Sequence, residues 1–257
     1  MFASEHRRLT LYEAGGLAIV RAGPLYLAIT LGTVPRTSSG GHFHNDLLGF
    51  ELQWDGIDFI VDGGAYLYTP VPALRDAFRS TAAHSTVCVS GSEQRTWPAG
   101  VGRLFSVQRD ADVRIVAATS ESLSMEATYD DVRHLRSWRW TSGELRIEDQ
   151  ISASRPATLA LNLHPALATR RIDPVASDRF RIVLERHGRQ AAIDMGGVRA
   201  VAMGEGYYSE GYGRRLPSEQ VHAELTGSHA TSHFIFQRVA HDSATSSSMD
   251  HAEGNTL

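Results

Sequence analysis

The sequence predicts an all-β protein, built as one large antiparallel β-sandwich of two broad layers with few or no helices. Short runs of alternating or β-branched residues recur along most of the chain at intervals typical of sandwiches. Turn-forming dipeptides such as Asp55-Gly56 separate neighbouring runs. Beyond Arg75 no segment has a sustained apolar period of 3.6 residues. These three observations favour many strands and few helices.

The chain opens with two predicted hairpins. Residues 16–22 and 25–31 are apolar runs separated by a Gly-Pro dipeptide, which indicates a strand, a tight turn and a second strand. Residues 47–54 and 57–61 flank Asp55-Gly56, and this dipeptide favours the turns that join antiparallel strands. The second hairpin therefore places residues 57–61 beside residues 47–54.

A loop and a long series of strands follow. Residues 66–83 contain two prolines and a short helix-forming run, so we predict a loop with about one helical turn. Strands are predicted to resume at His84 and then to begin near Leu104, Val113, Ser122, Leu135, Leu145, Thr158, Phe180, Ala191, Val221 and Ser232. We expect residues 1–240 to form one sandwich domain and the polar residues 241–257 to be a disordered tail.

Composition excludes several classes of protein. Hydrophobic residues make up 42% of the 257 residues and charged residues 21%, which is typical of a folded protein. The net charge of -4 gives no electrostatic reason to bind nucleic acid. All 25 basic residues are arginines, so a side chain that binds a substrate carboxylate through a positive charge would be a guanidinium. The one cysteine, Cys88, excludes an intramolecular disulfide, and neither a membrane span nor a signal peptide is visible.

The residues most suggestive of chemistry are three histidines and an aspartate. In an extended strand His42 and His44 would share one face while Phe43 turns towards the core. Asp62 ends the following predicted strand, and His84 begins another after the loop. Two imidazoles and a carboxylate suit a divalent ion such as zinc. The spacing matches no compact metal motif, so a polar network without metal is the alternative.

Four blocks of sequence resemble the C-terminal β domain of the heparinase II/III family. In chain order they are GHFHNDLL (41–48), IVDGG (60–64), YLYTP (66–70) and RSTAAHSTV (79–87). A fifth block, YYSEGYG at 207–213, also resembles that family. The resemblance spans most of the chain, from about Leu11 to Val239.

The resemblance implies a polysaccharide lyase in which an N-terminal α/α toroid docks on the sandwich, and an acidic glycan such as a glycosaminoglycan or alginate lies between them. It implies that His44, Asp62 and His84 hold a zinc ion, which we expect to be structural, and that His42 faces the substrate. The tyrosine and asparagine that complete catalysis would belong to the toroid, and no such helical domain is expected within this chain. A periplasmic or extracellular location would follow from the family.

β-Elimination beside a uronate requires a neutralised carboxylate, a base for the C5 proton and an acid for the leaving oxygen. His42 could act as the base or as the carboxylate partner, because imidazole exchanges protons near neutral pH; a backbone-bonded strand histidine is the alternative. Arg79 could bind the carboxylate through a guanidinium fork, or form a structural salt bridge. Tyr68 and Asn45 are further candidates for substrate binding, with aromatic packing as the alternative for Tyr68.

Two other functions fit part of the pattern. Cupins also carry a His-x-His pair on a β scaffold, but they place a glutamate four or five residues after the second histidine, where this sequence has Leu48 and Gly49. A non-catalytic module that binds glycans or docks to another domain, stabilised by a metal ion, is the second alternative. A lyase assay on acidic polysaccharides separates it from the lyase.

Overall fold

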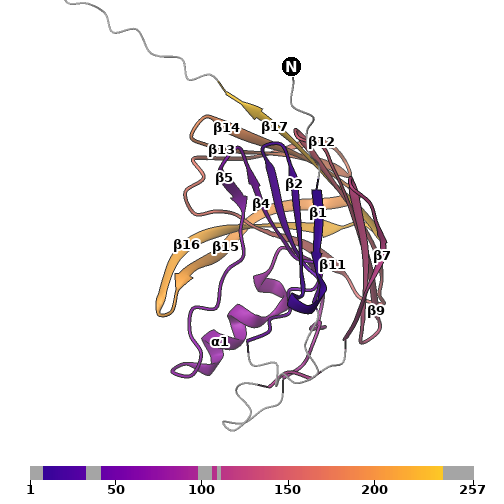
Figure 1. Cartoon of the computed structure of the whole chain (residues 1–257), viewed down its shortest axis with the longest axis vertical. Coiled ribbons are helices and arrows are strands. Elements are labelled where there is room, and N and C mark those ends of the chain that lie inside the picture. The colour runs from indigo at the N-terminus through magenta and orange to yellow at the C-terminus, as the bar shows by residue number, and fades with distance from the viewer. Residues whose placement is uncertain (1–7, 33–41, 98–105, 109–110, 240–257) are drawn as a thin grey trace, which may run out of the picture.

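The computed structural model describes residues 8–32, 42–97, 106–108 and 111–239. Within these ranges seventeen strands form three antiparallel sheets, beside a single α-helix, α1 (Pro72–Arg79), and two short 3-10 turns (Figure 1). The prediction of an all-β sandwich with few helices is confirmed. None of the helices in the described ranges is long and apolar enough to cross a membrane.

The N-terminal strands form a five-stranded sheet in simple sequential order. Its strands are β1 (Arg8–Tyr12), β2 (Leu17–Ala22), β3 (Leu25–Thr30), β4 (Phe50–Trp54) and β5 (Ile57–Ile60). Both predicted hairpins are present. At the second turn, Asp55 and Gly56 have φ values of 50° and 76°, the left-handed conformation that a two-residue turn of this kind requires.

A four-stranded sheet continues this layer. Its order is β15 (Val198–Gly211), β16 (Arg214–Leu225), β11 (Ala157–Asn162) and β6 (Val87–Val89). The amide of Val61 donates to the carbonyl oxygen of Asn162 at 3.1 Å, and the amide of His164 donates to that of Phe59 at 3.0 Å. These bonds connect the end of β5 to the end of β11, so the two sheets are joined.

An eight-stranded sheet forms the opposing layer and curves behind β1–β5 (Figure 1). Its order is β12 (Thr169–Ala176), β13 (Arg179–Arg186), β14 (Arg189–Gly196), β17 (His229–Arg238), β10 (Glu144–Ser152), β9 (Val132–Trp140), β8 (Ser122–Tyr129) and β7 (Ala111–Ala118). Aromatic rings join the layers: Trp54 stacks on Phe236 with centroids 5.7 Å apart, and Phe50 meets Phe234 edge-on at 6.2 Å. The core therefore lies between the two layers.

Several predicted boundaries were wrong. The strand predicted over 47–54 begins only at Phe50, because Leu48 has a φ of 58° that no strand residue adopts. The strand predicted from His84 begins at Val87. Strands β1, β12 and β15 were missed, since β12 contains a proline and several charges and β15 contains three glycines. The predicted strand start at Leu104 and the predicted tail at 241–257 lie outside the described residues.

A buried ionic network links the layers at the middle of β9 and β10. Arg136, with 0% of its surface exposed, donates from Nε to Asp149 Oδ1 at 2.6 Å and from Nη2 to Oδ2 at 3.1 Å. His134 Nε2 lies 2.6 Å from the same Oδ1. Burial alone would raise the pKa of Asp149, but the charge of Arg136 and the bond to His134 lower this pKa from 3.8 to about 2.

This lowered pKa predicts how acid destabilises the protein. A carboxyl group whose pKa is lower in the folded state contributes stability above its unfolded value, and this contribution is lost as the pH falls to the folded value. We expect the side-chain carboxyl carbon of Asp149 to titrate near pH 2 by NMR, and the free energy of unfolding to decline between about pH 4 and pH 2. Titration near pH 4, as in the urea-unfolded chain, would contradict this.

Candidate metal centre

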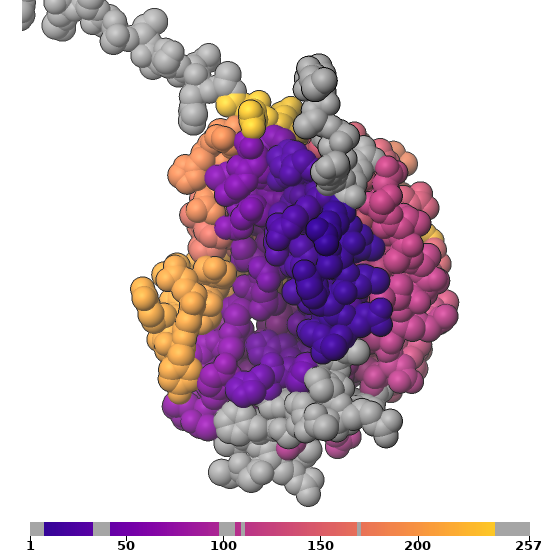
Figure 2. Space-filling view, in the orientation of Figure 1, coloured from indigo at the N-terminus to yellow at the C-terminus, as the bar shows by residue number. Residues whose placement is uncertain are grey.

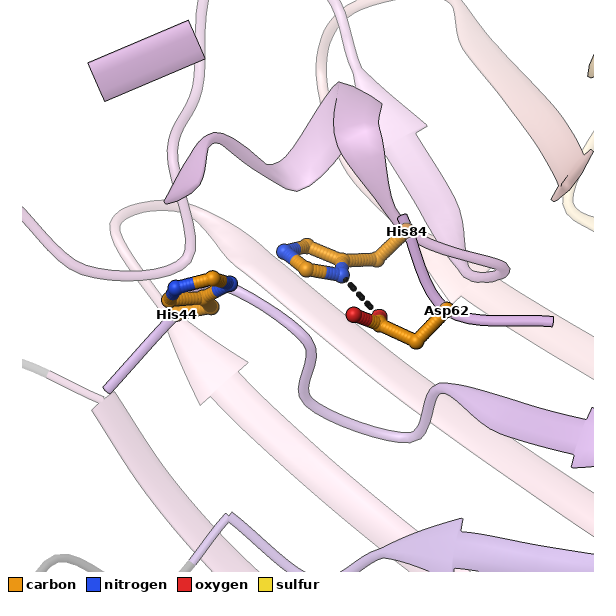
Figure 3. Close-up of side chains that lie close together, drawn as sticks. All are labelled: His44, Asp62 and His84. Carbon is orange, nitrogen blue, oxygen red and sulfur yellow. Dashed lines mark hydrogen bonds and ion pairs between the residues drawn. The ribbon is translucent and has the colours of Figure 1, made fainter. Parts of the chain in front are cut away.

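Three segments that are far apart in the sequence bring His44, Asp62 and His84 together. His44 lies between β3 and β4, Asp62 lies two residues after β5, and His84 directly follows the 3-10 turn Thr81–Ala83. One ligand atom from each residue lies within 4.8 Å of the other two. Figure 3 shows the ring of His84 between the other two side chains, with its edge opposite Asp62 turned towards His44. The three predicted ligands therefore meet in one cluster that could hold a metal ion.

Hydrogen bonds fix the orientation of this cluster. Asp62 Oδ2 lies 2.6 Å from His84 Nδ1 (Figure 3), and Asp62 Oδ1 accepts a bond from the amide of Gly64 at 2.8 Å. His84 is only 1% exposed, and within the described part of the chain its Nε2 has no hydrogen-bond partner. A buried imidazole nitrogen without a partner is costly unless a ligand occupies it.

The electrostatics hold His44 and Asp62 in the protonation states that a metal ion needs, whereas His84 would have to give up a proton. Burial, together with the nearby charge of His84, lowers the pKa of His44 to about 4, so its imidazole is neutral at neutral pH. Burial alone would raise the pKa of Asp62, but the attraction and the hydrogen bond of His84 outweigh it and lower this pKa. Burial alone would lower the pKa of His84, but Asp62 outweighs it and raises this pKa. A metal ion would replace the second proton of His84.

The donor set fits a borderline divalent ion. Neutral imidazole nitrogens and a carboxylate oxygen are the ligands that zinc takes in proteins, at about 2.0–2.2 Å. Each oxygen of Asp62 keeps a further lone pair beyond its hydrogen bond, so Asp62 could orient His84 and also bind the ion. Ligand atoms within 4.8 Å of one another need only small shifts to share one ion.

His42 and His44 do not lie in the predicted strand. Residues 42–49 form turns and irregular backbone with no strand, so the argument that both rings share one strand face does not apply. His44 faces His84, with ring centroids 5.2 Å apart. His42 is exposed, and its ring meets that of Tyr68 edge-on at 5.3 Å. His42 is therefore close to the cluster in sequence, but its ring contacts Tyr68 and not the ring of His84.

Asn45 and Arg79, two predicted substrate ligands, are buried. Asn45 Nδ2 donates to Glu93 Oε2 at 2.7 Å and to the carbonyl oxygen of Arg95 at 2.8 Å. Arg79 is 2% exposed, donates from Nε to the carbonyl oxygen of Phe43 at 3.2 Å and stacks over Trp97 at 5.0 Å. These contacts hold the segment that carries His44, and substrate binding by either residue stays a prediction.

Arg136, which sequence reasoning missed, also supports the cluster. Its Nη1 donates to the carbonyl oxygens of Leu48 at 2.8 Å and Ser85 at 3.1 Å. These residues follow His44 and His84 closely, so the buried arginine of β9 holds both histidine-bearing segments. The signal was present in the sequence: His134 and Arg136 fall on the same alternating face as the buried Trp138.

Tyr68 lines an aromatic face beside the cluster. Its ring stacks on that of Tyr212 with centroids 5.7 Å apart, while His42 contacts it from another side. Tyr212 is 60% exposed. Tyr66 has a φ of 52°, so Tyr66 and Tyr68 are not extended and do not share a face; Tyr66 packs on Phe78 instead, at 5.3 Å. The structure thus brings His42 and Tyr68 together.

Gly64 allows β15 to pack closely against the segment after Asp62. It has a φ of 74°, and a Cβ atom placed on it would lie 2.5 Å from the backbone oxygen of Ser209. Gly64→Ala is expected to lower the free energy of unfolding by more than about 2 kcal/mol, because it combines a strained φ with a backbone collision. Thermal and urea unfolding measure the effect.

Gly213→Ala is the matched control for this substitution. Gly213 has the same φ of 74°, but nothing lies within 4 Å of its added Cβ. Only the conformational cost of about 1 kcal/mol is expected there. Equal losses in the two variants would show that the approach of Ser209 has no energetic consequence.

The fold and the cluster define an antiparallel β-sandwich with a His/Asp centre that could hold a metal ion. The family model described as "Heparinase II/III-like, C-terminal" matches residues 5–248, and the chain belongs to this family. No curated protein matches it in sequence. The resemblance read from the histidine-bearing blocks is therefore confirmed.

Solved structures of larger proteins share the fold. The crystal structure of a heparinase III superposes with a TM-score of 0.72 at 14% identity, over 92% of this chain and 38% of that one. Heparan sulfate lyase HepC from Pedobacter heparinus gives a TM-score of 0.64 at 18% identity, over 87% of this chain and 35% of that one. At these identities the likeness shows a shared fold, and this chain spans little more than a third of either structure.

Proposed function

We propose that this chain is the β-sandwich part of a polysaccharide lyase that cleaves uronate-containing glycans by β-elimination, together with an α/α-toroid domain outside this chain. The supporting observation is the meeting of His44, Asp62 and His84 within 4.8 Å in a member of the heparinase II/III-like family. The exposed ring of His42 lies close by in sequence and contacts Tyr68.

In this proposal His42 takes the proton from C5 of the uronate. The electron pair of that bond forms the double bond between C4 and C5, the bond from C4 to the glycosidic oxygen breaks, and the departing oxygen receives a proton from an acid. His42 is exposed and can reach a bound glycan, whereas His44 and His84 face each other inside the cluster. The toroid would supply the acid and the remaining contacts with the sugar.

Zinc is the proposed ion, with His44, Asp62 and His84 as ligands, and its role is structural. Bound there, it would connect the three segments that carry His44, Asp62 and His84 through one ion, in addition to the hydrogen bonds that already join them. One of them is the loop from Tyr66 to Ala83, which carries Tyr68 on the aromatic face. The ligand residues would thereby keep Tyr68 and His42 in place.

The lyase assay tests this function. The zinc-loaded chain is incubated with heparosan, heparan sulfate and alginate, alone and with a separately produced α/α-toroid domain, while the absorbance of unsaturated uronate is followed. We expect product, and we expect His42→Ala to lower kcat by at least about 100-fold while zinc uptake is unchanged. Full activity in His42→Ala would exclude His42 as the base.

A glycan-binding or docking module without catalysis is the second candidate. It is favoured by the buried state of Asn45 and Arg79, which leaves an exposed face that is mainly aromatic. Binding of acidic oligosaccharides without any unsaturated product, with and without the toroid, would support this candidate over the lyase.

A further inference from the structure

We propose that Arg215 binds the carboxylate of the glycan, at the end of a partly exposed face formed by His42, Tyr68 and Tyr212. This inference rests on the proposed function, which it deepens by naming the residue of this chain that recognises the acidic group. Arg215 lies on β16, immediately after the turn of the β15–β16 hairpin. Sequence reasoning gave no signal for it beyond the neighbouring block at 207–213.

Two tyrosine rings hold the guanidinium of Arg215. Its Cζ lies 4.3 Å from the ring centroid of Tyr207 and 5.1 Å from that of Tyr66. Both rings also pack on Phe78 of α1, at 5.3 Å for Tyr66 and 6.4 Å for Tyr207. The charged group is thus stacked on rings that are themselves fixed, so binding an anion costs it little further side-chain entropy.

The hairpin is bonded to the segment that follows Asp62. The amide of Ser209 donates to the carbonyl oxygen of Gly63 at 3.0 Å, and the amide of Gly213 donates to that of Tyr66 at 2.8 Å. In Figure 2 the end of the hairpin, in orange, lies against the purple segment around residues 60–80. These backbone hydrogen bonds therefore attach the β15–β16 hairpin, which carries Arg215, to the segment that follows Asp62.

The aromatic face continues from this hairpin towards His42. The stacked rings of Tyr68 and Tyr212 are inclined by 22°, and the ring of His42 meets that of Tyr68 edge-on at 5.3 Å. Tyr212 is exposed and Tyr68 is half-buried, and tyrosine rings offer an apolar surface for the C–H groups of a pyranose ring while their hydroxyl groups can bond its hydroxyls. A sugar on this face would lie between the imidazole of His42 and the guanidinium of Arg215.

The charge of Arg215 is available to a ligand. Arg215 is exposed, and within the described residues no carboxylate is paired with it. Four other exposed arginines are paired with carboxylates: Arg171 with Asp173, Arg181 with Asp194, Arg199 with Glu224, and Arg238 with Asp55. The adjacent Arg214 lies 3.7 Å from Glu210. Arg79, the guanidinium favoured by sequence reasoning, is buried under Trp97.

A planar guanidinium suits a carboxylate because its N–H donors match the two oxygens. Sulfate esters present similar oxygens, so an experiment must distinguish binding of the carboxylate from binding of a sulfate group. Three oligosaccharides of equal length do this: unsulfated heparosan, its N-sulfated form, and heparosan with its carboxyl groups reduced to alcohols.

The test is an NMR titration of the zinc-loaded chain, with the Nε–Hε signals of the arginines as the readout. The variants are Arg215→Ala and, as matched control from the same hairpin, Arg214→Ala; zinc uptake and melting temperature report their folding. We expect Arg215→Ala to weaken the binding of heparosan about tenfold and Arg214→Ala to weaken it less than twofold. Carboxyl-reduced heparosan should bind the wild type and Arg215→Ala equally weakly.

Each other outcome overturns the inference. If both variants lose the same affinity for heparosan, Arg215 contributes only to the general positive charge of the hairpin. If Arg215→Ala loses affinity only for the N-sulfated glycan, Arg215 binds sulfate and not the carboxylate. If the wild type binds heparosan and Arg215→Ala binds it equally well, the inference fails while the proposed function stands. If the folded wild type binds none of the acidic oligosaccharides, both fail.

Discussion

His84→Ala is expected to abolish stoichiometric zinc binding and the stabilisation that comes with it. His84 contributes the only nitrogen of the cluster that is both buried and without a hydrogen-bond partner among the described residues, and its loss also removes the bond that orients Asp62. A ligand present at 1,000 times its Kd stabilises the folded state by about 4 kcal/mol, so the rise in melting temperature on adding zinc should disappear. Calorimetric titration and thermal unfolding with and without zinc measure both effects.

His229→Ala is the control that shows whether losing a histidine outside the cluster also affects zinc binding. His229 is exposed at the start of β17 and lies outside the cluster. Zinc binding and the zinc-dependent rise in melting temperature should be unchanged in this variant. Retention of one tightly bound zinc ion in His84→Ala would contradict the proposed ligand set.

Asp149→Asn is expected to lower the free energy of unfolding by about 3–5 kcal/mol. The substitution keeps the shape of the side chain but leaves the guanidinium of Arg136, which is 0% exposed, without its counter-charge. Since Arg136 also bonds the carbonyl oxygens of Leu48 and Ser85, zinc affinity should fall as well. Urea unfolding at pH 7 gives the first quantity, and zinc titration gives the second.

Asp173→Asn provides the comparison with an exposed ion pair. Asp173 is paired with Arg171 at 2.7 Å, and both side chains are largely exposed. Such pairs contribute about 0–1 kcal/mol, so this variant should unfold almost as the wild type does. A loss in Asp149→Asn as small as that in Asp173→Asn would mean that the buried network does not stabilise the fold.

The sequence predicted the fold class from local signals, and the cluster of His44, Asp62 and His84 from a family resemblance. Alternation of apolar residues and the Asp55-Gly56 turn are recorded in neighbouring residues, and the blocks around His44, Asp62 and His84 resemble a known family. The strand boundaries around His42 and His84 were wrong because backbone conformations such as the positive φ of Leu48 depend on packing. Alternation cannot reveal such a conformation.

The environment of the site could not be predicted from sequence. The burial of Arg79 and Asn45 depends on contacts with Phe43, Glu93 and Arg95, which are set by how distant segments pack. The stacking of Arg215 depends likewise on a hairpin more than 140 residues beyond Tyr66. No spacing rule connects such positions, so their roles emerge only from the folded chain.

The most direct test is a crystal structure of the zinc-soaked protein with anomalous data collected at the zinc absorption edge. The account predicts one strong peak bonded to a nitrogen of His44, a nitrogen of His84 and an oxygen of Asp62, at about 2.0–2.2 Å. A fully ordered cluster without a peak, or a zinc ion bound by other residues, would contradict the central claim.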